Sequence, residues 1–246
     1  MQSRDVRIIF IGMVLSCLFV SGQAMATPST FVELTVQGRT TSQKNGFTGA
    51  EISDSMTFAG ALAEGTAAVG TLKALASTTT PAVFADSLVQ FVDSFTIVGN
   101  GKIDLSQNIH GTQLVNGSGS ASILAVLDLT APQFAGLQTR YQKNTSTISI
   151  SFENDQGPLT VSVLNGQVYT ILATLRAGVQ GLFTLSHFSN TDNIYITSLT
   201  PGVTIVAESG HDYANPSLTV PLPNTWLLFA TGVIGLIGFR SRTAYQ

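Results

Sequence analysis

Residues 158–175 read PLTVSVLNGQVYTILATL, and their alternation indicates the fold class. Before the Asn165-Gly166 pair, apolar side chains recur at every second position, at Leu159, Val161 and Val163. A period of two is typical of β-strands that bury one face and expose the other to solvent. Because Asn and Gly tolerate the positive φ of tight turns, the stretch predicts a hairpin of two strands.

The same alternation recurs along the middle of the chain, and polar turn residues separate the repeats. The turn residues stand at 99–101, 116–119 and 155–158. Helical signals are weak: residues 130–141 predict a short helix or a loop, and Gly65 and Gly70 interrupt an Ala-rich run. The sequence therefore predicts a mainly β protein, a jelly-roll-like antiparallel β-sandwich over residues 27–215. The alternating apolar sets are Val32, Leu34 and Val36; Ile148, Ile150 and Phe152; Ile194 and Ile196; and Val203 and Ile205.

The N-terminus has the three parts of a secretory signal peptide. Arg4 and Arg7 precede an apolar run from Ile8 to Val20, and small residues follow at Ala24 and Ala26. This pattern predicts cleavage after Ala26, which makes residues 1–26 the signal peptide. The alternative is an uncleaved anchor, but the run is short for a permanent membrane span.

Cysteine and charge restrict the remaining possibilities. The single cysteine, Cys17, lies inside the apolar run, where we interpret it as a hydrophobic residue rather than a lipid attachment site. The exported chain would then fold without disulfides, by burial of its core alone. Residues 27–223 hold seven basic and thirteen acidic residues, a net charge of −6. The absence of a basic patch argues against a nucleic-acid partner.

The C-terminus combines a Pro-rich stretch, an apolar run and a basic tip. The eighteen residues 222–239 carry no charge and as a helix would span ~27 Å, enough for a thin bilayer. We therefore predict a transmembrane helix over about residues 224–239, with Trp226 at the outer interface and the basic tip in the cytoplasm. The alternative is a buried helix or strand of the sandwich. The glycines that would form a smooth stripe on the helix are Gly232, Gly235 and Gly238, and the basic tip is Arg240 and Arg242.

This arrangement over residues 220–242 resembles the PEP-CTERM sorting signal of Gram-negative bacteria. The resemblance implies recognition by exosortase, a membrane cysteine protease or transpeptidase, and release of the cargo to the cell surface or matrix. Leu222 departs from the Glu that the family name implies, although tails that read Val-Pro-Leu-Pro also occur. The sorting motif is Val220, Pro221, Leu222 and Pro223.

The body offers few groups for catalysis or metal binding. His110, His187 and His211 are far apart in sequence, no His-x-x-x-His or cysteine ligand spacing occurs, and no Gly-x-Ser-x-Gly elbow is present. We therefore expect no cofactor, no metal and no catalytic residue. The remaining candidates are polar turns that could bind Ca²⁺ and aromatic side chains that belong mostly to the core. The polar turns are Glu153 with Asp155 and Asn190 with Asp192 and Asn193; the aromatic residues are Phe91, Phe95, Phe183, Phe188, Tyr169 and Tyr195. His211 and Asp212 we interpret as a solvated loop.

Two functions remain open. The first is a non-enzymatic structural protein of the surface or of an exopolysaccharide-rich matrix such as a biofilm, held transiently in the inner membrane and then cleaved by exosortase. The second is a secreted β-sandwich carbohydrate-binding module or hydrolase that acts on extracellular polysaccharide, with a site near Glu153, Asp155 or residues 190–193. A permanently anchored periplasmic protein is a third alternative.

Overall fold

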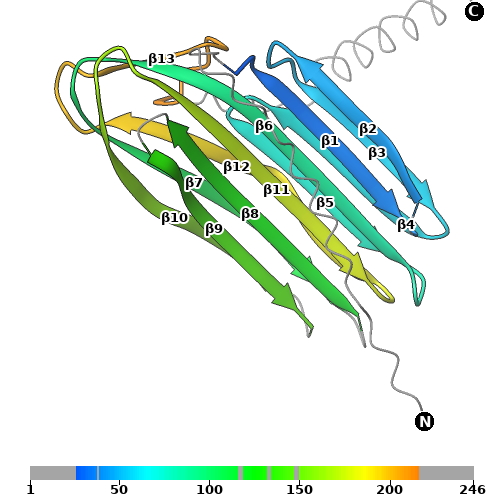
Figure 1. Cartoon of the computed structure of the whole chain (residues 1–246). Helices are drawn as coiled ribbons and strands as arrows, with labels where there is room; N and C mark the ends of the chain where they lie inside the picture. The colour runs from blue at the N-terminus through cyan, green and yellow to red at the C-terminus, as the bar shows by residue number, and fades with distance from the viewer. Residues whose placement is uncertain (1–25, 38, 116–118, 132–133, 147–149, 216–246) are drawn as a thin grey trace, which may run out of the picture.

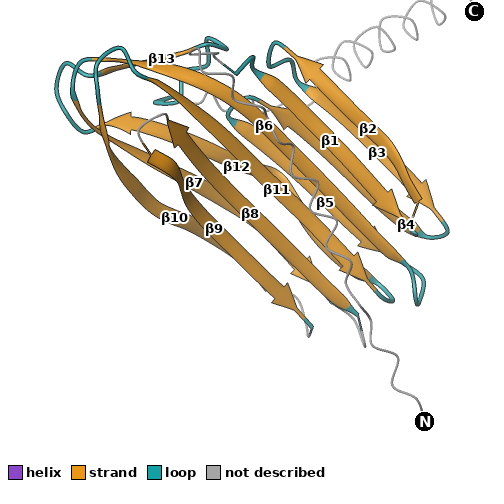
Figure 2. Cartoon of the chain, viewed as in Figure 1, coloured by secondary structure: helices purple, strands orange, loops and turns teal. Residues whose placement is uncertain are grey.

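The computed structural model describes residues 26–37, 39–115, 119–131, 134–146 and 150–215. These residues form thirteen β-strands, and no helix lies among them (Figure 2). The strands are β1 (Ser29–Val36), β2 (Arg39–Phe47), β3 (Ile52–Phe58), β4 (Ala61–Ala68), β5 (Thr71–Thr78), β6 (Phe84–Val98), β7 (Gly101–Leu114), β8 (Ser120–Ala131), β9 (Phe134–Thr145), β10 (Ile150–Val163), β11 (Val168–Gln180), β12 (Thr184–Ser198) and β13 (Thr204–Ala207).

The strands build two antiparallel sheets that pack face to face (Figure 1). Sheet A has the order β2-β1-β6-β11-β8-β9, with β13 beside β6, and sheet B has the order β10-β7-β12-β5-β4-β3. Across the interface β1 contacts β4, and β5 contacts both β6 and β11. The prediction of a mainly β, antiparallel sandwich is confirmed.

Strands β5 to β12 pass back and forth between the two sheets. Their order is β5-β12-β7-β10 in sheet B and β6-β11-β8-β9 in sheet A, and only β8 and β9 follow each other within one sheet. This is the strand order of an eight-stranded jelly roll, which consists of two Greek keys. The four N-terminal strands widen it: β1 and β2 extend sheet A beyond β6, and β4 and β3 extend sheet B beyond β5.

The core lies between the sheets and follows the alternation seen in the sequence. Val32, Leu34 and Val36 of β1 are fully buried, as are Ile194 and Ile196 of β12. Burying a side chain of this size contributes about 1.5–3 kcal/mol, so these strands are held mainly by their inward faces. The described residues contain no cysteine, and burial of this kind takes the place of disulfides.

The Asn165-Gly166 pair forms a turn, but the predicted hairpin is wrong. Strand β10 belongs to sheet B and β11 to sheet A, so this turn carries the chain from one sheet to the other. Its polar groups contact the β6–β7 turn: the amide of Gly99 donates to Asn165 Oδ1 at 2.8 Å, and the amide of Asn165 donates to Asn100 Oδ1 at 2.8 Å. Alternation reveals which face of a strand is buried, and it does not reveal the neighbouring strand.

Two other predicted turns and loops are strands instead. Residues 155–158 lie inside β10, whose register with β7 shifts between Gln156 and Leu159 as at a β-bulge. The alternating apolar residues around Ile150 and those around Leu159 therefore belong to one long strand, β10. The helix or loop expected over residues 130–141 is also wrong, because β8 and β9 pair there as antiparallel neighbours. The Ala-rich run is likewise extended, as β4 and β5.

An ion pair joins the sheets at one edge of the sandwich. Lys44 Nζ on β2 lies 3.0 Å from Asp54 Oδ1 on β3 and also donates to the carbonyl of Ser53 at 2.9 Å. Strands β2 and β3 are the edge strands of sheets A and B at this side. A charged contact at an edge discourages further strand pairing there.

Candidate functional site

The last described residues close one end of the sandwich. Strand β13 pairs with β6 on the side that β1 leaves vacant, since β1 begins opposite Val92 and β13 pairs with residues 95–98. The chain then continues as residues 208–215, which we call the exit segment. The amide of Glu208 donates to the carbonyl of Ser94 on β6 at 2.8 Å, and the amide of Ile196 on β12 donates to the carbonyl of Tyr213 at 3.2 Å. The exit segment thus runs from sheet A to sheet B.

Asp93 on β6 is the anchor of the exit segment. Its side chain is fully buried, at a position where the inward pattern of β6 would place an apolar residue between Phe91 and Phe95. Oδ2 accepts hydrogen bonds from Ser209 Oγ at 2.6 Å and from the Tyr213 hydroxyl at 2.8 Å. Oδ1 accepts from the amides of Ser94 at 2.8 Å and Ser209 at 3.3 Å. A buried carboxyl group satisfied by four donors is held firmly in place.

Tyr213 shares this buried environment. Its side chain is 2% exposed, and burial together with the neighbouring Asp93 raises the pKa of its hydroxyl well above the usual range. The raised pKa favours the protonated phenol, which donates to Asp93.

The N-terminal end of the described chain meets the same place. The amide of Ala26 donates to Ser94 Oγ at 3.1 Å, and Ser94 Oγ lies 3.3 Å from the carbonyl of Ala26. Ala26 is one of the two small residues of the predicted signal cleavage site; the other, Ala24, lies outside the described residues. Adjacent residues of β6 therefore contact the exit segment, through Asp93, and Ala26, through Ser94.

His211 is packed rather than solvated, which corrects the interpretation of this loop. Its ring is half-buried and meets the Tyr213 ring edge-on, with centroids 4.7 Å apart. Burial lowers the pKa of His211, although the nearby carboxylates Asp93 and Asp212 act in the opposite direction. Asp212 is exposed as expected, and its Oδ1 accepts from the amide of Ala214 at 3.0 Å.

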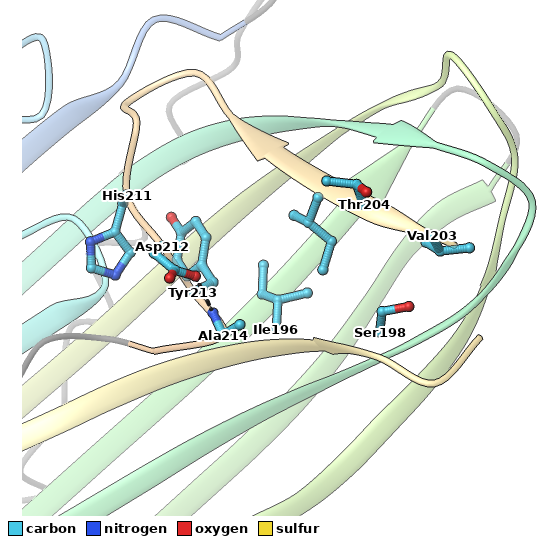
Figure 3. A pocket seen from close by; sticks show the side chains of 9 residues that line it. Ile196, Ser198, Val203, Thr204, His211, Asp212, Tyr213 and Ala214 are labelled. Carbon is cyan, nitrogen blue, oxygen red and sulfur yellow. Dashed lines mark hydrogen bonds between the residues drawn. The ribbon is translucent and has the colours of Figure 1, made fainter. Parts of the chain in front are cut away.

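A hollow of about 250 Å³ lies beside the exit segment, between β12 and β13 (Figure 3). Ile196 and Ser198 of β12 line one side, Val203 and Thr204 another, and residues 211–214 the third. The lining mixes apolar with polar side chains, the polar ones being Ser198, Thr204, His211, Asp212 and Tyr213.

Sheet B carries a polar outer face over β10, β7 and β12. The register places Asp155 opposite Asn108, and Asn108 opposite Asn193, in one row across the three strands. Glu153 lies opposite His110 in the same way, and Ser106 lies opposite Tyr195. The structure thus brings together the two predicted polar stretches, although the side chains of Glu153, Asp155 and Asn190 lie outside its described part.

Asp192, by contrast, lies in the interior, and the prediction of an exposed polar turn is wrong for this residue. Its side chain is fully buried on β12, and the Nε2 amide of Gln107 on β7 donates to its Oδ2 at 2.6 Å. Burial raises its pKa from 3.8 to about 8. Among the residues that the structure describes, Asp192 Oδ1 and Gln107 Oε1 have no hydrogen-bond partner.

The remaining candidates behave mostly as core residues. Phe91, Phe95, Phe188 and Tyr169 are buried, whereas Phe183 is 53% exposed and Tyr195 lies partly exposed on the outer face of sheet B. Within the described ranges, no group of three or more His, Cys, Asp or Glu side chains is arranged to hold a metal ion. The histidines lie on separate elements: His110 on β7, His187 on β12 and His211 in the exit segment.

The predicted sorting and membrane residues lie outside the described residues. This applies to the motif at 220–223, to Trp226 and the three glycines of the predicted helix, and to Arg240 and Arg242. In the part of the chain that the structure does describe, no helix is long and apolar enough to cross a membrane.

The anchor residues Asp93, Ser209 and Tyr213 were not predicted from the sequence. One signal was present, because Asp93 interrupts the apolar alternation of residues 91–95 at an inward position. Its partners lie 116 and 120 residues further along the chain, and no local pattern connects them.

Comparisons with known proteins add one firm result. No curated protein matches the chain. One similar solved structure is that of TmCBM61 in complex with β-1,4-galactotriose, with 7% identity and a TM-score of 0.26 over 60% of this chain and 88% of that one. So low a TM-score supports no inference about this chain. The family model of the PEP-CTERM protein-sorting motif matches residues 219–242. The C-terminal region of this chain is therefore a PEP-CTERM protein-sorting motif, directly beyond the exit segment.

Proposed function

We propose that the chain is an exported, non-enzymatic structural protein of a bacterial surface or extracellular matrix, sorted and cleaved by exosortase. The observation that carries this proposal is the PEP-CTERM motif at residues 219–242, four positions beyond the last described residue of the sandwich. Exosortase and the inner membrane are its transient partners, and exopolysaccharide is the surrounding material. In this proposal the chemistry takes place at the tail, and the sandwich is the cargo.

The architecture of the body supports a structural role. Its interior is filled by inward side chains of both sheets. The described strands all end before the exit segment, so that removal of the tail at residues 219–242 leaves them in the chain. A cargo domain has to remain folded after its tail is cleaved.

Mass spectrometry of cell fractions tests the proposal. We expect an extracellular form that ends near residues 220–226 and lacks the apolar run LLFATGVIGLIGF, in a host that encodes an exosortase. Deleting the exosortase gene should leave the full-length chain in the membrane fraction. An extracellular form that retains residues 227–239 would contradict the proposal. If Pro221→Ala/Pro223→Ala leaves the location unchanged, a permanent periplasmic anchor is favoured instead.

A second candidate function is polysaccharide binding on the outer face of sheet B. The register places Asp155, Asn108 and Asn193 in one row across β10, β7 and β12, with Tyr195 partly exposed nearby on β12; Asn193 is only 7% exposed. Amide, carboxyl and aromatic groups bind sugar hydroxyls and stack on sugar rings.

A glycan array on residues 27–219 tests this second function, with a calcium thermal-shift assay alongside. Binding that is lost in Tyr195→Ala but kept in Phe183→Ala would support it, because Phe183 is an exposed aromatic residue outside this face. No binding to any glycan and no shift with calcium would remove it.

A further inference from the structure

The exit segment is held at both ends of its course between the sheets. At its start, Glu208 extends the pairing of β13 with β6, and Ser209 bonds to Asp93 through both its amide and its hydroxyl. At its end, the Tyr213 hydroxyl bonds to Asp93 and its carbonyl accepts from Ile196. Tyr213 is 2% exposed and is the last buried side chain in the part of the chain that the structure describes.

The distance from this contact to the sorting motif is short. Seven residue steps separate Tyr213 from Val220. A fully extended chain covers ~3.3–3.6 Å per residue, so that the motif lies at most ~25 Å from the Tyr213 backbone. Without the contacts of the exit segment, the last held residue would be Ala207 of β13, thirteen steps away, and the reach would grow to ~45 Å.

From this we propose that Asp93, Ser209 and Tyr213 are positioning residues for processing of the tail. They fix the point at which the chain leaves the folded body and so limit how far the body can lie from the enzyme that cuts the motif. This inference rests on the proposed cleavage by exosortase. It adds that the enzyme must reach a motif held close to a folded domain, rather than one on a free linker.

Shortening the linker is the direct test, in full-length chains expressed with an exosortase. Deleting residues 215–218 leaves three steps between Tyr213 and Val220, a reach of ~11 Å. We expect the cleaved fraction to fall at least several-fold. Replacing the same four residues with Gly-Ser-Gly-Ser keeps the length and should leave cleavage unchanged.

Insertions at two different positions distinguish this proposal from the simpler explanation that cleavage only requires a linker of sufficient length. In the shortened chain, four residues inserted after Tyr213 should restore cleavage. The same four inserted between Ala207 and Glu208, before the anchored residues, should not. Equal restoration by both insertions would overturn the positioning role.

A second measurement follows cleavage in variants whose exit segment has lost its side-chain hydrogen bonds to Asp93. Ser209→Ala/Tyr213→Ala in the shortened chain extends the reach from Ala207 to ~32 Å, so cleavage should recover. The matched control is Glu208→Ala, whose side chain is exposed on the same segment and should not restore cleavage. Circular dichroism of each variant confirms that the sandwich is folded.

The outcomes distinguish the two proposals. If the wild-type chain is not cleaved in exosortase-bearing cells, the proposed function fails and the positioning role fails with it. If the wild type and the shortened chain are cleaved equally, the proposed function stands and only the positioning role is overturned.

Discussion

Two buried aspartates illustrate how surroundings decide the behaviour of a carboxyl group. Asp93 accepts four hydrogen bonds, whereas Asp192 accepts one from Gln107 and its Oδ1 has no partner among the described residues. Burial raises the pKa of Asp192 from 3.8 to about 8, so at neutral pH this group is mostly protonated in the folded protein. In the unfolded chain it is ionised at the same pH.

This difference predicts that stability falls with rising pH. Between about pH 4 and pH 8 the folded state holds a proton at Asp192 that the unfolded state has lost, so the free energy of unfolding decreases across this window. We expect a loss of a few kcal/mol, at roughly 1.4 kcal/mol per unit of pKa shift, which levels off above pH 8. Asp192→Asn should remove most of this slope in urea unfolding at pH 5, 7 and 9. A variant with the wild-type slope would contradict the assignment.

Gly70 is required by the position of His211. A Cβ at residue 70 would lie 2.1 Å from His211 Nε2, and the backbone there has φ +80°. We expect Gly70→Ala to lower the free energy of unfolding by about 2–3 kcal/mol, since it combines a clash with a left-handed conformation. Gly202→Ala is the control: its φ is +81° but nothing lies within 4 Å, so it isolates the backbone cost. Equal losses in denaturant unfolding would show that the His211 contact is unimportant.

At the scale of elements, two turns hold each other at one end of the sandwich. The β6–β7 turn and the β10–β11 turn exchange hydrogen bonds through Asn100 and Asn165, each at 2.8 Å. Both turns carry the chain between sheets, so these contacts fix the relative position of four strands.

Removing either side chain should therefore weaken the other turn. We expect Asn165→Ala and Asn100→Ala each to cost about 1 kcal/mol of unfolding free energy, and the double variant to cost less than their sum. Asn144→Ala, an exposed position on β9, is the control and should change stability by less than about 0.5 kcal/mol. Strictly additive losses would mean that the two turns act independently.

The sequence predicted the strands better than their connections. Period-two alternation identified the inward faces of β1 and β12 because burial of one sheet face imposes that pattern directly. It could not show that Asn165-Gly166 crosses between sheets, because a turn with positive φ serves an arch as well as a hairpin. The Gly157-Pro158 pair predicts a turn. Strand β10 nevertheless accommodates it at a bulge, where the hydrogen bonds between β10 and β7 are already interrupted.

For the whole molecule, the end of the fold can be located by truncation. A chain that ends at residue 219 keeps the exit segment and should unfold at the temperature of the full-length body. A chain that ends at residue 207 loses the donors of Ser209 and Tyr213 and leaves Asp93 with the Ser94 amide alone. We expect it to lose about 3–5 kcal/mol of unfolding free energy, because a buried carboxyl group loses three of its four hydrogen-bond donors. Calorimetry of both chains checks this, and equal melting temperatures would contradict the anchoring role of Asp93.

The candidate site was predictable only in part at this scale. The tail motif is local, so its residues could be identified in the sequence and the family model matches them. The Asp93 anchor joins β6 to residues more than a hundred positions later, and the row across β10, β7 and β12 depends on strand order. Both features exist only once the topology is known.

The nested strand order has a consequence for the time at which the protein can fold. Strand β5 pairs with β12, and β6 pairs with β11, and both partners lie late in the chain. Neither sheet can therefore be completed until roughly the last fifth of the body has been synthesised. High contact order of this kind slows folding, because long loops must close before their contacts form. A chain that stays open for so long is well suited to a secretion channel that threads polypeptides in an unfolded state.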